Sequence, residues 1–190
     1  RYFARGGAKI IGISDSKGGL YNPNGLDIAR TLECKNQYEC LLAEHVEAET
    51  ITNEELLELE CDILIPAALG DQITAENAPR MRCRILAEGA NGPTEPEADD
   101  ILVDKGVFIL PDILANAGGV TVSYFEWVQN LQELLWTEKE VSERLHHIIT
   151  TALAEVLRIS QERKVSMRKA AYILGVGRVA RATELRGVYP

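Results

Sequence analysis

Four short apolar runs divide the first two thirds of the chain. They occupy residues 8–15, 61–66, 84–88 and 106–111, and glycine, proline or an acidic residue ends each of them. Runs of this length with such boundaries are typical of buried strands. Helical segments separate them, so the chain alternates strand and helix. This alternation predicts an α/β fold in which helices cover both faces of a parallel sheet.

Polar residues mark where the helices are expected to begin. Three spacings of the type Thr-x-x-Glu predict capping boxes: Thr52 with Glu55, Thr94 with Glu97, and Thr137 with Glu140. A further helix is expected over residues 27–35. From Val120 onward the pattern becomes helical only, with helices at about residues 120–135, from 137, and from the predicted N-cap Ser166 to Arg186. The last third is therefore expected to be a helical extension.

The charge of the chain narrows the possible partners. Its 190 residues carry a formal net charge of −9, which disfavours nucleic acid and anionic membrane surfaces. Residues 155–190 are nevertheless basic, at +5. A nucleic-acid arm is one interpretation of this tail, but its basic residues alternate with helical apolar positions, which favours a solvated helix face. No run of eighteen apolar residues occurs, so we expect no membrane span.

Cysteine usage and targeting signals indicate a reduced, cytoplasmic protein. Cys34, Cys40, Cys61 and Cys83 form no CxxC pair, and no histidine cluster accompanies them, so we expect neither zinc nor disulfides. The chain begins at Arg1 without a signal peptide. Its opening resembles the end of a helix with a glycine stop, so we expect it to begin within a domain.

Candidate site residues follow the expected strands, where parallel sheets bind ligands. Asp15, with Ser16 beside it, ends the first strand, and an acid there can bind the ribose hydroxyls of a dinucleotide. The small residues Ala67 and Ala68 would let a ligand approach the backbone. Each of these features also has a plainer interpretation: Asp15 as the cap of a turn, and the alanines as a packing turn.

Two further loops combine glycines with asparagine. Asn91 lies between a strand end and a helix start, where its amide could bind a ribose or a carboxamide. Asn116 precedes a Gly-Gly pair and the helix that carries Ser123. The alternatives are a turn with Asn91 in a left-handed conformation, and a helix C-cap at Asn116.

Taken together, these loops resemble the glutamate dehydrogenase family. The stretches GISDSKGGLYNPNG, CDILIPAAL, AEGANGPTEPEAD and PDILANAGGVTVSYFEW are similar to its cofactor domain. The resemblance implies a Rossmann-like, doubly wound parallel sheet that lacks its first strand, followed by C-terminal helices. It further implies a partial dinucleotide-binding domain at residues 1–135 and a helical segment at residues 136–190.

The resemblance also implies roles for individual residues. Asp15 and Ser16 would bind the adenosine ribose, Ala67 and Ala68 would lie along the cofactor, and Asn91 would lie near the nicotinamide ribose. Asn116 would contact both the nicotinamide and the substrate, and Val120 and Ser123 the glutamate side chain. The expected cofactor is NAD, with NADP possible, because Asp15 favours NAD while Ser16 and Lys17 could accommodate a phosphate.

What the family pattern requires beyond these residues is not in the sequence. Its GxGNxG phosphate-binding turn, its catalytic lysines and its catalytic aspartate would precede residue 1, so we expect no catalytic residue in this chain and a truncated protein. The missing strand would leave the strands at 8–15 and 61–66 with unpaired edges, unless the sheet rearranges or another chain fills the gap. The parent would convert L-glutamate to 2-oxoglutarate and ammonia as a homohexamer. The alternative is a non-catalytic dinucleotide-binding or assembly module.

Overall fold

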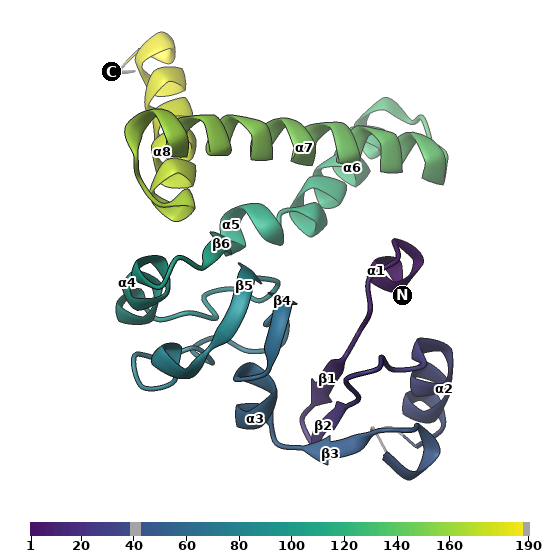
Figure 1. Ribbon diagram of the computed structural model, residues 1–190. Helices are drawn as coiled ribbons and strands as arrows, with labels where there is room; N and C mark the ends of the chain where they lie inside the picture. Colours follow the sequence, from purple (N-terminus) through teal and green to yellow (C-terminus); the bar gives the residue numbers. More distant parts are fainter. Residues whose placement is uncertain (39–42, 188–190) are drawn as a thin grey trace. The chain divides into compact units, whose positions relative to one another are not determined.

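The computed structural model describes residues 1–38 and 43–187, so Cys40 lies outside the described residues. The chain forms two compact units (Figure 1). The first comprises Arg1–Glu60 with Arg80–Arg82, and the second comprises Cys61–Pro79 with Cys83–Pro190. Each is described by itself below.

An antiparallel sheet forms the centre of the first unit. After the short helix α1 (Tyr2–Arg5), β1 (Gly12–Asp15) pairs with β2 (Gly18–Tyr21), which pairs with β3 (Glu49–Ile51). The expectation that residues 8–15 form a buried strand of the parallel sheet is therefore wrong. The strand begins only at Gly12, is half-buried, and pairs antiparallel through a two-residue turn at Ser16 and Lys17.

Close packing against β3 explains why the second residue after that turn is a glycine. A Cβ atom on Gly19 would lie 3.1 Å from Cγ1 of Ile51 and 3.2 Å from its carbonyl oxygen, so β3 approaches β2 more closely than a side chain would allow. Leu20, Leu26 and Val46 form the buried core beneath the sheet. The two glycines after the turn, a residue type typical of turns, begin a strand here.

Three helical segments complete this unit. They are α2 (Ile28–Tyr38), the 3-10 turn η1 (Ala43–His45) and α3 (Asn53–Leu57). The predicted capping box of α3 is confirmed. Glu55 donates its backbone N–H to the Thr52 hydroxyl at 3.1 Å, and the Thr52 N–H donates to the Glu55 carboxylate at 2.8 Å.

A second sheet has the strand order β4 (Glu60–Leu64), β5 (Arg82–Ala87) and β6 (Phe108–Leu110). β5 and β6 are parallel, with Leu86 opposite Ile109. A short 3-10 turn, η2 (Ala78–Arg80), precedes β5. This parallel three-stranded sheet and the helices that follow it confirm the predicted α/β class.

The helix α4 (Pro96–Asp104) starts one residue later than the capping-box pattern predicts. Glu95, not Thr94, occupies the N-cap, and its side chain makes no capping hydrogen bond, so the predicted box of Thr94 and Glu97 is wrong. The reason is a parallel bridge that pairs Thr94 with Ile73, after which Glu95 donates its N–H to the Ile73 carbonyl at 2.9 Å. Pro96 occupies the first turn, where the missing N–H costs no intrahelical hydrogen bond.

Four helices form the C-terminal part: α5 (Asp112–Ala115), α6 (Gly118–Gln132), α7 (Glu138–Arg163) and α8 (Met167–Arg186). The capping box at Thr137 and the N-cap at Ser166 are both confirmed. α6 begins two residues earlier than predicted. Leu114 of α5 packs in one core with α7 and the first turns of α8. α7 contributes Val156 and Ile159 to this core, and α8 contributes Met167, Ala170 and Ala171.

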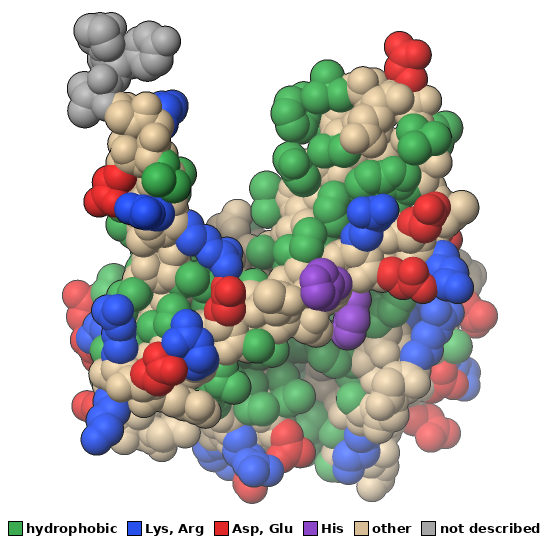
Figure 2. All heavy atoms as spheres, turned by 90° about the horizontal axis from the view of Figure 1, so that it is seen from above, with side chains coloured by type: hydrophobic (Ala, Val, Ile, Leu, Met, Phe, Trp, Pro, Cys, Tyr) green, Lys and Arg blue, Asp and Glu red, His purple; other side chains and the backbone are tan. Residues whose placement is uncertain are grey.

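Some apolar side chains of the helices remain exposed. Figure 2 looks down on the helices drawn at the top of Figure 1, and hydrophobic side chains lie among charged ones there. On α6 the exposed apolar residues are Val120, Tyr124, Trp127 and Leu131. Within residues 1–38 and 43–187, every helix is either too short or too polar to cross a membrane.

Candidate functional site

In the first unit, the turn after β1 holds the predicted residues Asp15 and Ser16. One carboxylate oxygen of Asp15 accepts the Lys17 backbone N–H at 2.8 Å, as in an Asx turn. The other forms an ion pair with Nζ of Lys35, on α2, at 2.5 Å. Asp15 is thus both a turn cap and one partner of an ion pair, while Ser16 and Lys17 are exposed.

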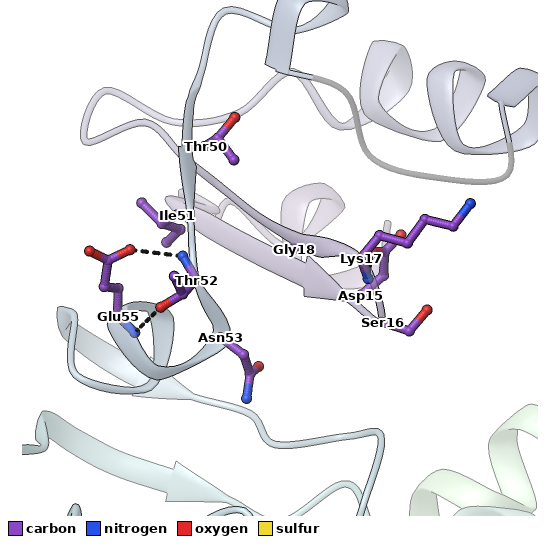
Figure 3. A pocket seen from close by; sticks show the side chains of 9 residues that line it. All are labelled: Asp15, Ser16, Lys17, Gly18, Thr50, Ile51, Thr52, Asn53 and Glu55. Atoms are coloured by element: carbon purple, nitrogen blue, oxygen red, sulfur yellow. Dashed lines mark hydrogen bonds between the residues drawn. The ribbon is translucent and has the colours of Figure 1, made fainter.

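An open hollow of about 380 Å³ lies beside this turn (Figure 3). Asp15, Ser16, Lys17 and Gly18 line one part of it, and the segment from β3 to α3 lines the rest: Thr50, Ile51, Thr52, Asn53 and Glu55. The Ser14 hydroxyl donates to the Asn53 side chain at 3.2 Å and connects β1 to α3. The Thr52–Glu55 spacing predicted a helix start here, but nothing in the sequence placed it next to Asp15.

In the second unit, the loop after β4 packs against the loop after β5. The backbone N–H groups of Gly89 and Ala90 both donate to the Pro66 carbonyl at 2.9 Å. A Cβ atom on Gly89 would lie 3.0 Å from Cβ of Ala67, so this approach requires glycine. Ala67 and Ala68 are exposed.

Asn91 and Asn116 are brought together although 25 residues separate them. Nδ2 of Asn116 donates to Oδ1 of Asn91 at 2.7 Å and to the Ala90 carbonyl at 3.3 Å. Asn91 is exposed and Asn116 is half-buried. The positive φ of this loop belongs to Gly92, at 54°, so the interpretation of Asn91 as a left-handed turn residue is wrong. Asn116 is the C-cap of α5, as the alternative interpretation predicted.

Val120 and Ser123 are three residues apart on α6 and therefore share one side of the helix. Both are exposed, Val120 to 71%. The structure thus joins Asn116 to Asn91 and places Val120 and Ser123 on the surface of α6, in the same unit as Ala67 and Ala68. Asp15 and Ser16 belong to the other unit.

Sequence reasoning missed a largely buried ion cluster in the same unit as the asparagines. The guanidinium of Arg168 on α8 contacts Glu88 at 2.6 Å, Asp99 at 2.8 Å and Asp112 at 3.4 Å, and we call these four residues the Arg168 cluster. Glu88 is fully buried and the Arg168 side chain is 21% exposed. The interpretation of the basic tail as a solvated helix face is therefore wrong for Arg168.

The acidic residues of the cluster also shift the pKa of Arg168. Burial alone would lower the pKa of Arg168, but hydrogen bonds and charges from Glu88 and Asp99 outweigh it and raise the pKa above its usual value. The guanidinium is thus a permanent cation that can anchor several acceptors at once. No sequence spacing connects residues 88, 99, 112 and 168, so only the folded chain reveals the cluster.

Known proteins match almost the whole chain. A sequence model described as Glutamate/Leucine/Phenylalanine/Valine dehydrogenase matches residues 1–187. The chain is 50% identical to a glutamate dehydrogenase from Thermotoga maritima, covering 97% of this chain and 44% of that protein. It is 51% identical to an NAD-specific glutamate dehydrogenase from Staphylococcus aureus, covering 95% of this chain and 43% of that one.

Solved structures of glutamate dehydrogenases also match this chain. A hetero-hexameric glutamate dehydrogenase from Thermus thermophilus, in a Leu-bound form, matches with a TM-score of 0.90 at 32% identity, over 100% of this chain and 44% of that one. A glutamate dehydrogenase from Peptoniphilus asaccharolyticus matches with a TM-score of 0.81 at 34% identity, over 99% and 43%. The chain therefore spans less than half the length of these relatives.

Proposed function

The chain belongs to the glutamate/leucine/phenylalanine/valine dehydrogenase family, and from this premise we propose that it is the cofactor-binding part of a glutamate dehydrogenase. The observation that carries the proposal is the identity of 50–51% to glutamate dehydrogenases over at least 95% of this chain. Residues 1–135 would provide the dinucleotide contacts, and residues 136–190 the helices packed beside them.

We propose NAD as the cofactor, which the name of the S. aureus relative supports. In the first unit, Asp15 would accept hydrogen bonds from the adenosine ribose hydroxyls, with Ser16 beside it. Asp15 is already paired with Lys35, so a ribose would share the carboxylate with that lysine. A carboxylate also repels a ribose phosphate, which favours NAD over NADP, although Lys17 and Lys35 reduce that repulsion.

In the second unit, Asn91 would bind the nicotinamide ribose and Asn116 the nicotinamide end. Their mutual hydrogen bond at 2.7 Å supports this proposal, because it leaves Nδ2 of Asn91 and Oδ1 of Asn116 to bind a ligand. Ala67 and Ala68 would lie along the cofactor. Val120 and Ser123, exposed on α6, would contact the substrate together with Asn116.

The complete protein would oxidise L-glutamate to 2-oxoglutarate and ammonia as hydride passes to NAD. Its catalytic lysines and aspartate would lie outside these 190 residues, since relatives extend over more than twice this length. The 190-residue chain alone would accordingly bind dinucleotide weakly and turn over no glutamate. We further propose that the complete protein is a cytoplasmic homohexamer. The hetero-hexameric T. thermophilus enzyme supports the number of six subunits in this proposal.

Titration of the 190-residue chain with NADH and NADPH tests the cofactor proposal. We expect NADH to bind more tightly and Asn91→Ala to weaken it about three- to tenfold, the loss of one hydrogen bond. Asn130→Ala, an exposed asparagine on α6, is the matched control and should leave binding unchanged. Glutamate turnover by the chain alone would contradict the proposal that the catalytic residues lie outside these 190 residues. Tight binding without turnover in the full-length protein would favour the non-catalytic module.

A further inference from the structure

Two carboxylates of the Arg168 cluster each bridge the guanidinium to the backbone of a site loop. Glu88 accepts from Arg168 at Oε1 and from the Asp112 N–H at Oε2, at 2.6 Å and 2.8 Å. Asp112 faces Arg168 with Oδ1 and accepts the Gly92 N–H at Oδ2, at 2.9 Å. Gly92 directly follows Asn91, and Asp112 begins the short helix α5, whose C-cap is Asn116.

We propose that Arg168 is a positioning residue that fixes Asn91 and Asn116 through Glu88 and Asp112. The consequence for cofactor binding rests on the proposed function, in which these asparagines contact the nicotinamide end. The positioning itself does not depend on that function. It follows from the fact that both loops are attached to a single guanidinium, on a helix far away in the sequence.

Asp99 explains why the guanidinium can serve as a fixed point. One oxygen of Asp99, on α4, accepts from both Nε and Nη2 of Arg168, at 2.9 Å and 2.8 Å. These two hydrogen bonds orient the planar group, so that its remaining donors face Glu88 and Asp112. Lysine at this position would supply the charge but not the planar fork.

The first turns of α8 have a second anchor besides this guanidinium. The neighbouring residues Met167, Ala170 and Ala171 are buried in one core with Leu114 and Val156, and they anchor the first turns of α8. Removing the guanidinium should therefore leave the helix in place and loosen the two loops. This separates a positioning role from a general contribution to stability.

Residue-resolved hydrogen exchange on the 190-residue chain, without dinucleotide, tests the proposal. In Arg168→Met we expect the Gly92 and Asp112 amides to exchange at least about tenfold faster, the size expected when charge-assisted hydrogen bonds are lost. The side-chain amide signals of Asn91 and Asn116 should shift as well. Arg178→Met, which removes an exposed α8 arginine paired with Glu155, is the matched control and should change neither.

Arg168→Lys keeps the test decisive if Arg168→Met fails to fold, because it retains the charge and should loosen the same amides to a smaller extent. Unchanged exchange at Gly92 and Asp112 in a folded variant overturns the proposal. So does faster exchange spread evenly over α7 and α8. NADH titration of the same samples then distinguishes the positioning role of Arg168 from the proposed cofactor contacts. If the loops loosen but NADH never shifts Asn91 in the unaltered chain, the cofactor proposal fails while the positioning role stands.

Discussion

The two regions proposed to contact the dinucleotide are stabilised in different ways. The Asp15 turn depends on a hydrogen bond to Lys17, two residues away, and on a lysine whose side chain is 40% exposed. The Asn91–Asn116 region depends on a buried cluster in which Arg168 and Glu88 lie 80 residues apart. One region is specified locally by turn chemistry, whereas the other requires the C-terminal helix to be folded. Perturbations of the second region should therefore have the larger and more distant effects.

The largest loss of stability is expected from Glu88→Ala. The substitution removes a fully buried carboxylate from Arg168 and leaves the Asp112 N–H without its acceptor. Breaking a buried pair in this way costs about 3–5 kcal/mol, measured as the free energy of unfolding in urea. Glu155→Gln, at the exposed pair with Arg178, is the control and should cost less than about 1 kcal/mol. A loss below about 1 kcal/mol for Glu88→Ala would show that the cluster stabilises nothing.

Core substitutions test whether the two regions respond separately. Leu114→Ala, in the core shared with α7 and α8, and Leu20→Ala, in the core of the antiparallel sheet, should each cost about 2–5 kcal/mol. We expect the first to accelerate hydrogen exchange around Asn116 and the second around Gly19. The comparison breaks down if Leu20→Ala reduces protection at Asn116 as much as at Gly19.

The sequence revealed the features that depend on near neighbours. The capping boxes of α3 and α7 were predicted because their residues lie three apart, and the N-cap of α8 because a serine precedes the helical pattern. β2 and β3 were not. Gly18 and Gly19 have the composition of a turn, and β3 is only three residues long, too short to show alternation. The Thr94 prediction failed because pairing with a distant residue, Ile73, displaced the helix start.

The candidate site likewise contains residues that the sequence could predict and residues that it could not. Strand ends and glycines pointed to Asp15 and Asn91, and the structure then joined Asn91 to Asn116. Arg168 was missed because periodicity can assign a residue to a helix face but cannot show that three acidic residues from separate segments meet there. Ion pairs between residues this far apart produce no recognisable pattern of spacing in the sequence.

A smaller effect is expected where the first region is stabilised locally, at the hollow beside Asp15. Thr52→Ala removes the hydroxyl that caps α3 and should cost about 1 kcal/mol, again as the free energy of unfolding in urea. Thr52→Ser retains the hydroxyl and should restore most of the stability. Equal losses in the two variants would show that the methyl group, not the cap, is responsible.

The smallest effect, and the most local, is a pH dependence at the start of α7. The Glu140 carboxylate accepts hydrogen bonds from the backbone N–H and the hydroxyl of Thr137, and these lower its pKa below the ordinary 4.5. Because the folded chain binds this proton less readily, the contribution is present above pH 4.5 and is lost as the pH falls through the lowered pKa. In an NMR titration, the Thr137 amide signal should follow the Glu140 carboxyl, and Glu140→Gln should abolish that titration. If Glu140 instead titrates at or above 4.5, the capping box does not favour the charged carboxylate, and local hydrogen bonding does not stabilise this end of the helix.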